Sequence, residues 1–270
     1  MRDLSALPDL RLALLQGPLA WHAVPANLEY FGALLASLEA VDLVLLPEMF
    51  NTGFSMDSAT QAEPEMGPTT QWLLEHAQRL NAVVCGSLIL KVAEGDYRNR
   101  LIWARPDGSL AHYDKRHLFR MAGEHHHFTA GEQQLQVELK GWRIRPLICY
   151  DLRFPVWSRD AENTDLLFYL ASWPAARRMA WNRLLPARAI ENLCYVAAVN
   201  RTGTDQQGYA YSGDSQVLNF MGETLLNAGD QDGVFYVSLQ ANKLAEFKQR
   251  FPAYLDADTF SWTSIAHLIG

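Results

Sequence analysis

A strand gives way to a polar turn in the segment Pro146-Leu147-Ile148-Cys149-Tyr150-Asp151-Leu152-Arg153-Phe154-Pro155. A cysteine at the end of a strand can present its sulfur to a cleft, whereas a cysteine inside a strand usually packs as a small hydrophobic side chain. In layered α/β folds, the edge where strands end is where ligands and reacting groups are usually found. The position of Cys149 therefore makes it a candidate nucleophile, which would need a base, an oxyanion stabiliser and a substrate anchor elsewhere in the chain.

Short apolar segments alternate with helical patterns in the first third of the chain. Strands are expected at residues 10–15, 41–46 and 82–90, and helices at residues 25–40 and 69–80. Apolar positions spaced three and four apart indicate the helices, and continuous apolar runs indicate strands buried on both faces. This alternation predicts parallel strands joined by helical crossovers.

The middle and the end of the chain combine hairpins with further crossovers. A hairpin is expected between residues 100–104 and 110–113 around Asp107-Gly108, and a second one between 135–139 and 142–149. After this hairpin, helices are expected from Pro155 to about Glu162 and at 179–193, and strands at 166–171 and 195–200. A closing strand pair is expected at 216–226 and 234–239. The chain then ends in a short helix and an aromatic tail that contains Phe251, Tyr254, Phe260 and Trp262. We expect an α/β fold in which two mixed sheets pack face to face between helical layers.

Bulk composition excludes several classes of function. The chain has 270 residues, of which 49% are hydrophobic and 20% charged, and its net charge is −7. This length and composition support a sizeable core, and the absence of repeats and linkers favours one domain. No basic stripe is evident, which argues against a nucleic-acid partner. No segment approaches the ~20 consecutive apolar residues of a membrane-spanning helix, so no membrane insertion is expected.

Cysteine usage and the N-terminus indicate the compartment. Three cysteines, Cys85, Cys149 and Cys194, cannot form a complete set of disulfides, which fits a reducing environment. Cys85 and Cys194 are embedded in apolar sequence, so we expect both to be inert core thiols. The N-terminus lacks the basic region and long apolar stretch of a signal peptide, and a cytoplasmic location is therefore expected.

Glu48 and Lys115 are candidates for the base and the cation. Glu48 directly follows an apolar strand, where a partly desolvated carboxylate can act as a general base. Lys115 lies at the end of a predicted hairpin strand, from which a fixed cation could stabilise an oxyanion. Taken alone, a surface or capping glutamate and a solvated lysine at a strand end are the more common explanations of the two positions.

Histidines and an arginine offer further interpretations. Adjacent residues of an extended segment point in different directions, so the triplet His125-His126-His127 is expected to form a polar loop and not a metal site. His117 is available for a Cys–His pair, although nothing in its local sequence supports one. Arg153 could hold a substrate carboxylate through its guanidinium fork, or form a salt bridge with Asp151.

Together, these segments resemble the nitrilase, or carbon–nitrogen hydrolase, superfamily. The resemblance rests on three signature segments in the family order, which are Leu46-Pro47-Glu48-Met49-Phe50, Tyr113-Asp114-Lys115-Arg116-His117-Leu118-Phe119 and Leu147-Ile148-Cys149-Tyr150-Asp151-Leu152-Arg153-Phe154-Pro155. Further matches are Arg188-Ala189-Ile190-Glu191-Asn192, Val199-Asn200-Arg201 and Tyr211-Ser212-Gly213-Asp214-Ser215. The segment from Gly123 to Gly131 is most similar to the omega-amidase branch.

The resemblance implies a four-layer α-β-β-α sandwich that forms a single carbon–nitrogen hydrolase domain over residues 1–270, with a core at about 8–240 and a C-terminal extension at 241–270. It implies a triad in which Glu48 is the base, Lys115 the oxyanion cation and Cys149 the nucleophile, with Glu124 as a second glutamate nearby. It also implies a homodimer built on the helices next to Cys149 and the C-terminal region. No metal or organic cofactor is expected.

The omega-amidase branch implies hydrolysis of 2-oxoglutaramate and 2-oxosuccinamate through a cysteine thioester. We expect Arg153 to bind the substrate carboxylate, the backbone N–H of Tyr150 to help Lys115 hold the oxyanion, and Phe119 and Trp173 to wall the pocket. Two alternatives remain at this point. The same triad could serve another small amide or a nitrile, or the chain could bind a small ligand without turning it over.

Overall fold

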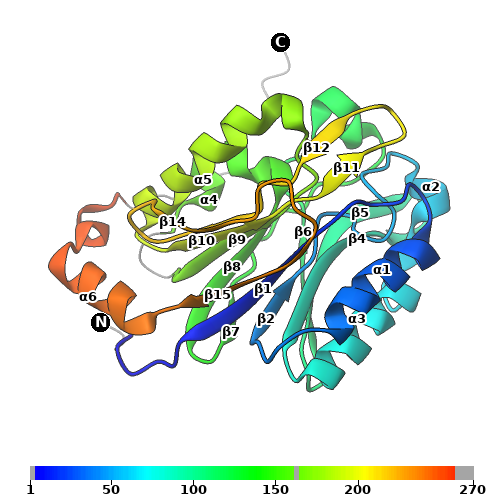
Figure 1. The fold of residues 1–270 in the computed structure, drawn as a ribbon. Coiled ribbons are helices and arrows are strands. Elements are labelled where there is room, and N and C mark those ends of the chain that lie inside the picture. Colours follow the sequence, from blue (N-terminus) through cyan, green and yellow to red (C-terminus); the bar gives the residue numbers. More distant parts are fainter. Residues whose placement is uncertain (1–3, 161–163, 259–270) are drawn as a thin grey trace, which may run out of the picture.

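The computed structural model of this protein describes residues 4–160 and 164–258 (Figure 1). Figure 1 shows two β-sheets that pack face to face, with helices on both outer sides. The expected four-layer α-β-β-α sandwich is therefore confirmed.

The first sheet has seven strands within the described residues. They are β1 (Leu10–Gln16), β2 (Leu43–Leu45), β3 (Glu63–Pro64), β4 (Val83–Ala93), β5 (Asp96–Ala104), β6 (Leu110–Asp114) and β15 (Gly233–Leu239). Their spatial order is β15-β1-β2-β4-β5-β6, with β3 paired to β4. The pairs β1–β2 and β2–β4 are parallel, as the helical crossovers predict, whereas β5, β6 and β15 are antiparallel to their neighbours.

The second sheet has six strands in the described part of the chain. They are β7 (Val137–Leu139), β8 (Trp142–Ile148), β9 (Leu166–Leu170), β10 (Tyr195–Val199), β13 (Gln216–Leu218) and β14 (Thr224–Asn227), in the spatial order β14-β13-β10-β9-β8-β7. The three central strands β8, β9 and β10 are parallel, so their carboxyl ends meet at one edge. A separate hairpin consists of β11 (Thr202–Thr204) and β12 (Ala210–Ser212).

Helices cover the outer face of each sheet. The α-helices are α1 (Val24–Ala36), α2 (Ser58–Gln61), α3 (Pro68–Leu80), α4 (Pro155–Ser158), α5 (Arg178–Asn192) and α6 (Ala241–Arg250). Short 3-10 helices are η1 (Arg120–Ala122), η2 (Glu124–His126), η3 (Cys149–Arg153), η4 (Ala175–Arg177) and η5 (Ala253–Asp256). Figure 1 shows α1 and α3 beside the first sheet, and α4 and α5 beside the second. No helix among the described residues is long and apolar enough to cross a membrane.

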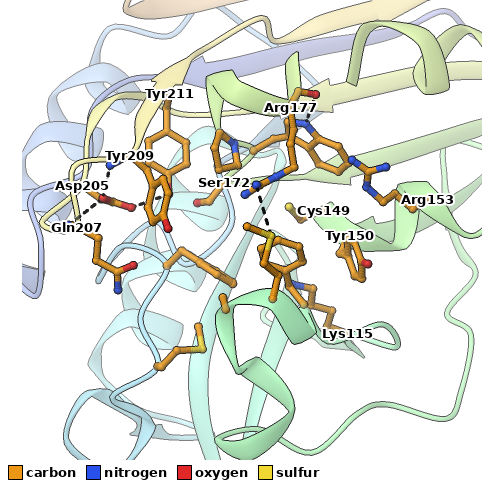
Figure 2. A pocket seen from close by; sticks show the side chains of 17 residues that line it. Lys115, Cys149, Tyr150, Arg153, Ser172, Arg177, Asp205, Gln207, Tyr209 and Tyr211 are labelled. Carbon is orange, nitrogen blue, oxygen red and sulfur yellow. Dashed lines mark hydrogen bonds between the residues drawn. The ribbon is translucent and has the colours of Figure 1, made fainter. Parts of the chain in front are cut away.

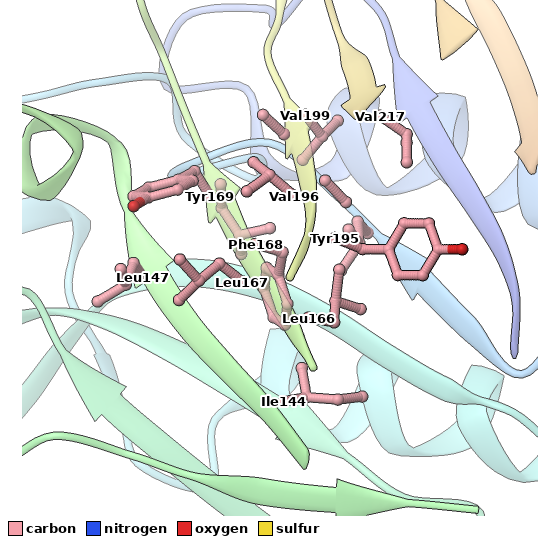
Figure 3. Close-up of a cluster of buried hydrophobic side chains, with 14 of the residues drawn as sticks. Ile144, Leu147, Leu166, Leu167, Phe168, Tyr169, Tyr195, Val196, Val199 and Val217 are labelled. Atoms are coloured by element: carbon pink, nitrogen blue, oxygen red, sulfur yellow. The ribbon is translucent and has the colours of Figure 1, made fainter. Parts of the chain in front are cut away.

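The main core lies between the two sheets. On β1, Leu12 and Leu14 face this inter-sheet core, whereas Ala13 and Leu15 belong to a second core beneath α1 and α3. This alternation follows from the two-residue period of a strand. The rings of Trp103 and of Phe168 in the second sheet stack with centroids 6.1 Å apart. Figure 3 shows the apolar side chains that β8, β9, β10 and β13 contribute. Both sheets are thereby held as a rigid support for the loops at their edge.

The expected closing pair of strands at 216–226 and 234–239 is wrong. The side chain of Asn219 accepts hydrogen bonds from the backbone N–H groups of Met221 and Glu223, and Gly222 has a φ of +78°. Because this turn folds the segment on itself, β13 and β14 form their own hairpin. The last strand, β15, pairs instead with β1 in the other sheet.

The helix expected from Pro155 to about Glu162 is shorter than predicted. It ends at Ser158, and Arg159 is already extended. The backbone N–H of Asp160 donates to the side chain of Asn192 at 2.7 Å, so it is not available to continue the helix. Glu162 lies outside the described residues, as do Phe260 and Trp262 of the aromatic tail.

Candidate active site

The strand ends bring the candidate residues to one edge of the sandwich. Glu48 lies shortly after β2, Lys115 directly after β6 and Cys149 directly after β8. A pocket of about 240 Å³ opens at this edge (Figure 2). It is lined by Phe54, Met56, Lys115, Phe119, Met121, Ala122, Cys149, Tyr150, Arg153, Ser172, Trp173, Pro174, Arg177, Asp205, Gln207, Tyr209 and Tyr211.

Cys149 occupies a sharp turn between β8 and η3. Its φ is +42°, a left-handed conformation that costs a residue with a side chain about 1 kcal/mol or more. The turn takes the sulfur out of the strand and into the pocket lining, and only 8% of the residue is exposed. The strained backbone therefore serves to present a nearly buried thiol to whatever occupies the pocket.

Asp151 fixes this turn. Its fully buried carboxylate accepts hydrogen bonds from the backbone N–H of Ile148 at 3.1 Å and from the hydroxyl of Tyr113 at 2.8 Å. It also accepts from the backbone N–H of His117 at 3.0 Å and pairs with its ring Nδ1 at 2.8 Å. Because Tyr113 and His117 flank Lys115 in sequence, Asp151 ties the cysteine turn to the segment that carries the lysine.

The contacts of His117 and Arg153 differ from the Cys–His pair and from the salt bridge with Asp151 that the sequence left open. The ring of His117 stacks on Phe154 with centroids 3.7 Å apart, and its Nδ1 pairs with Asp151. The thiol of Cys149 instead has a hydrogen bond with Glu48. Arg153 lies over the ring of Trp173 at 5.1 Å, whereas the oxygens of Asp151 are taken by the donors named above.

A buried cluster surrounds the ammonium group of Lys115. Its Nζ lies 2.8 Å from Oε1 of Glu48, and 3.0 and 2.9 Å from the two carboxylate oxygens of Glu124. The amide of Asn99 donates to Glu48 at 2.8 Å and to Glu124 at 3.3 Å. The exposed fraction of each of these four residues is 1% or less, so the charges of the lysine and the two glutamates interact with little solvent screening.

Other hydrogen bonds orient the two carboxylates. The backbone N–H of Ser172, at the end of β9, donates to Oε2 of Glu48 at 3.0 Å. The hydroxyl of Ser172 donates to the backbone carbonyl of Glu48 at 3.0 Å. The backbone N–H of Phe119 donates to Oε2 of Glu124 at 2.5 Å. These bonds hold both glutamates rigidly against Lys115.

Electrostatics keep the lysine charged and the cysteine protonated. Burial opposes the charge of Lys115, but Glu124 and Glu48 outweigh it and raise the pKa of the ammonium group. Burial raises the pKa of Glu124, and Glu48 raises it further, while Lys115 acts in the opposite direction. Burial and the charge of Glu48 raise the pKa of the Cys149 thiol well above its usual value, although Lys115 lowers it. The resting site thus contains a neutral thiol beside a carboxylate that can accept its proton.

The four expected substrate-binding residues all line the pocket. The rings of Phe119 and Tyr150 pack edge to face with centroids 4.9 Å apart. The guanidinium group of Arg153 stacks over the ring of Trp173. Figure 2 shows Tyr150 and Arg153 near the sulfur of Cys149. Aromatic surfaces and a guanidinium group thus surround the thiol.

Sequence reasoning missed Asn99. The predicted hairpin began at Arg100, but β5 begins at Asp96, and Arg100 pairs with Asp114. The next position in this register places Asn99 opposite Lys115, whose backbone N–H donates to the carbonyl of Asn99 at 3.0 Å. Extending the hairpin by one residue pair would have found it.

Sequence reasoning also missed Arg177 and the β11–β12 hairpin. Arg177 lies over the ring of Phe119 at 5.0 Å. The hairpin contributes Asp205, Tyr209 and Tyr211 to the pocket wall (Figure 2). One sequence signal pointed to this hairpin, since the segment that begins at Tyr211 resembles the family. That resemblance did not indicate a role for the segment in the pocket.

The remaining histidines and cysteines lie apart from this chemistry. His125 is partly buried, His126 and His127 are exposed, and the rings of the first two lie 3.8 Å apart. Within residues 4–160 and 164–258, no group of three or more His, Cys, Asp or Glu side chains is placed to hold a metal ion. Cys85 and Cys194 are fully buried, and burial raises the pKa of Cys194 to about 12, as expected for inert core thiols.

Known proteins share this sequence and fold. The protein is 48% identical to the omega-amidase YafV of Yersinia enterocolitica over 255 residues, which is 94% of this chain and 99% of the relative. It is 32% identical to the 2-oxoglutaramate amidase of Bacillus subtilis over 80% of this chain and 84% of that protein.

A solved structure agrees with these sequence relatives. XC1258 from Xanthomonas campestris, described as a CN-hydrolase superfamily protein with an arsenic adduct in the active site, superposes with a TM-score of 0.92. It is 48% identical, and the match covers 95% of this chain and 100% of that one. The carbon–nitrogen hydrolase family model matches residues 11–249. The chain that carries this cysteine pocket therefore belongs to the carbon–nitrogen hydrolase family.

Proposed function

We propose that this protein is an omega-amidase that hydrolyses the terminal amide of 2-oxoglutaramate to 2-oxoglutarate and ammonia. The shorter 2-oxosuccinamate would yield oxaloacetate in the same way. The observation that carries the proposal is the thiol of Cys149, which lies in a pocket lined also by Lys115 and two arginines and has a hydrogen bond with the buried carboxylate of Glu48. The names of the two sequence relatives support the same activity.

The first half of the reaction forms a thioester. Glu48 takes the proton of the Cys149 thiol as the sulfur attacks the amide carbonyl carbon. The hydrogen bond between the two side chains supports this transfer. The carbon–nitrogen bond then breaks, and Glu48 returns the proton to the leaving nitrogen, which departs as ammonia. The acyl group of the substrate remains on the sulfur.

The second half releases the acid. Glu48, now a carboxylate again, takes a proton from a water molecule that attacks the thioester carbon. The carbon–sulfur bond breaks, and the proton held by Glu48 returns to the sulfur of Cys149. Glu124 does not contact the thiol in this scheme but fixes Lys115, whose Nζ it holds at 2.9 Å. The cycle consumes one amide and one water and restores the resting site.

Two donors would stabilise the tetrahedral oxyanions. Lys115 is charged, buried and part of the pocket lining, so its ammonium group is already fixed close to the reacting thiol. The backbone N–H of Tyr150 is the second donor, because it follows the nucleophile directly at the start of η3. Removing one such donor typically costs about 3 kcal/mol of transition-state stabilisation.

Arg153 would anchor the far end of the substrate. It enters the pocket four residues after Cys149, and its stacking on Trp173 leaves its N–H groups free to bind a carboxylate. The anchor sets the distance between the carboxylate and the amide that meets the sulfur. This arrangement supports an amide at the opposite end of a short acid.

Ammonia release tests the proposed activity. The purified protein is incubated with 2-oxoglutaramate and with a panel of neutral amides, carbamoyl compounds and nitriles. We expect the highest kcat/KM for 2-oxoglutaramate, no release by Cys149→Ala and nearly full release by Cys194→Ala, which also lacks one thiol. A clear preference for a nitrile or a neutral amide would refute the proposal.

A homodimer through the outer helices is part of the same proposal. The helices α4 and α5 expose the apolar side chains of Val156, Met179 and Ile190, by 52%, 78% and 53%. Apolar side chains exposed on the outer helices favour an interaction surface there. Light scattering should give twice the chain mass for the wild type and a shift toward the monomer for Ile190→Glu. A monomeric wild type would contradict this part of the proposal.

A further inference from the structure

Two arginines enter the pocket from neighbouring 3-10 helices. Arg153 of η3 lies over Trp173 at 5.1 Å, and Arg177 of η4 lies over Phe119 at 5.0 Å. Both line the pocket that contains Cys149, and Figure 2 shows both side chains around its sulfur. Stacking on an aromatic face positions a guanidinium group and leaves N–H groups at its edge for a ligand. One N–H group of Arg177, on Nη1, also donates to the sulfur of Met121 at 3.9 Å, a long and weak contact.

Asp205 is the one acidic residue in the described pocket lining, and its carboxylate already has partners. Its carboxylate accepts the hydroxyl of Tyr211 at 2.9 Å and the backbone N–H of Gln207 at 2.9 Å. The buried guanidinium of Arg201 lies 4.3 Å from the centre of the Tyr211 ring and interacts electrostatically with Asp205. Asp205 is therefore occupied in fixing the β11–β12 hairpin.

The charges of Arg153 and Arg177 are thus left for the ligand. Lys115 is balanced by Glu48 and Glu124, and Asp205 by Arg201. One carboxylate of a substrate neutralises one arginine. A second guanidinium beside it favours a further acceptor oxygen on the same end of the substrate.

We propose that Arg177 is a specificity residue that, together with Arg153, selects the 2-oxo acid end of the substrate. The two guanidinium groups bind the carboxylate and the adjacent carbonyl oxygen, and they repel the α-ammonium group of an amino acid amide. This inference rests on the proposed function, since it assumes a terminal amide that bears a carboxylate at its other end.

Three ligands of equal chain length isolate the role of Arg177. 2-Oxoglutaramate has a carbonyl at carbon 2, glutaramate has a methylene there, and glutamine has an ammonium group. All three share the carboxylate and the terminal amide. Differences in affinity among them therefore report only on the group at carbon 2.

The test measures binding by calorimetry in Cys149→Ala, in which no turnover occurs. We expect 2-oxoglutaramate to bind more tightly than glutaramate, and glutamine to bind most weakly. Adding Arg177→Gln should lower the affinity for 2-oxoglutaramate about ten- to hundredfold, which is the range for a charge-assisted hydrogen bond. The loss of affinity for glutaramate should be several-fold smaller. The affinity for glutamine should stay the same or increase. Arg177→Lys should restore only part of the loss, because lysine lacks the planar fork.

A matched control removes an arginine charge from a position outside the pocket lining. Arg183 is exposed on α5, and Arg183→Gln should leave all three affinities unchanged. Equal losses for 2-oxoglutaramate and glutaramate in Arg177→Gln, no measurable binding of 2-oxoglutaramate, or the same loss in Arg183→Gln would overturn the inference. The binding result is independent of ammonia release. Selective binding without turnover would refute the proposed function alone, and turnover without an effect of Arg177 would refute this inference alone.

Discussion

The carboxylate of Asp151 accepts a hydrogen bond from the hydroxyl of Tyr113 at 2.8 Å, and this bond joins the turn that carries Cys149 to the strand that leads to Lys115. The same hydroxyl accepts a hydrogen bond from the indole N–H of Trp157 at 2.9 Å. One buried hydroxyl therefore links the position of the sulfur to the position of the ammonium group.

Tyr113→Phe should weaken both the fold and the reaction. The substitution leaves the indole N–H of Trp157 and one oxygen of Asp151 without this partner, which typically costs about 1–3 kcal/mol. We expect a loss of that size in the free energy of unfolding in urea and a fall in kcat. Tyr97→Phe, at a half-buried tyrosine outside this network, serves as the control. Unchanged kcat in Tyr113→Phe would show that the two segments are positioned independently.

Asn99→Leu should lower kcat about tenfold with little change in KM. The amide of Asn99 is a donor to both Glu48 and Glu124, so its loss leaves the two carboxylates less firmly oriented against Lys115. An equal rise in KM, or an unchanged kcat, would contradict this positioning role of Asn99.

The sequence predicts the layers and the triad edge well because both depend on local patterns. Short apolar runs such as 82–90 and 166–171 favour buried strands between helices, and Glu48 and Cys149 each follow such a run. The two strands belong to different sheets, and the face-to-face packing of these sheets brings the two residues to a common edge. This reasoning needs no knowledge of side-chain contacts.

The elements that were mispredicted depend on distant contacts. The pairing of β15 with β1 joins residues more than 200 positions apart, and no local pattern distinguishes it from pairing with the nearby β14. The early end of α4 depends on Asn192, and the role of Asp151 depends on Tyr113 and His117. The arginine at position 177 becomes visible as a pocket residue only once η4 is placed.

Alkylation of Cys149 should follow its raised pKa. Because burial and the charge of Glu48 favour the neutral thiol, the thiolate fraction in the free enzyme should rise about tenfold per pH unit through neutral pH. The logarithm of the rate of inactivation by iodoacetamide, measured from about pH 6 to 9, should therefore increase without a plateau. A plateau beginning near pH 6 would mean that the resting site contains a thiolate.

Glu124→Gln should change how stability depends on pH. Burial and Glu48 raise the pKa of Glu124 in the folded protein, against the effect of Lys115, whereas an unfolded glutamate titrates at about pH 4.3. A raised folded-state pKa means that the stabilising contribution of this carboxyl is complete below about pH 4.3 and is lost as pH rises through the folded-state value. The difference in the free energy of unfolding, wild type minus Glu124→Gln, should therefore fall as pH rises.

Urea unfolding at intervals between about pH 4 and 8 measures this difference. Glu138→Gln is the control, since Glu138 is exposed on β7 and should give a flat difference. A difference that rises with pH for Glu124→Gln would reverse the assigned direction of the pKa shift.

Trapping the acyl enzyme tests the role of Cys149 most directly. The protein is mixed with 2-oxoglutaramate, quenched in acid within milliseconds and analysed by intact-mass and peptide mass spectrometry. We predict one 2-oxoglutaryl group per chain, on the peptide that contains Cys149, with an adduct in Cys194→Ala and none in Cys149→Ala. Ammonia release that continues undiminished in Cys149→Ala, or an acyl group on any other residue, would contradict the mechanism.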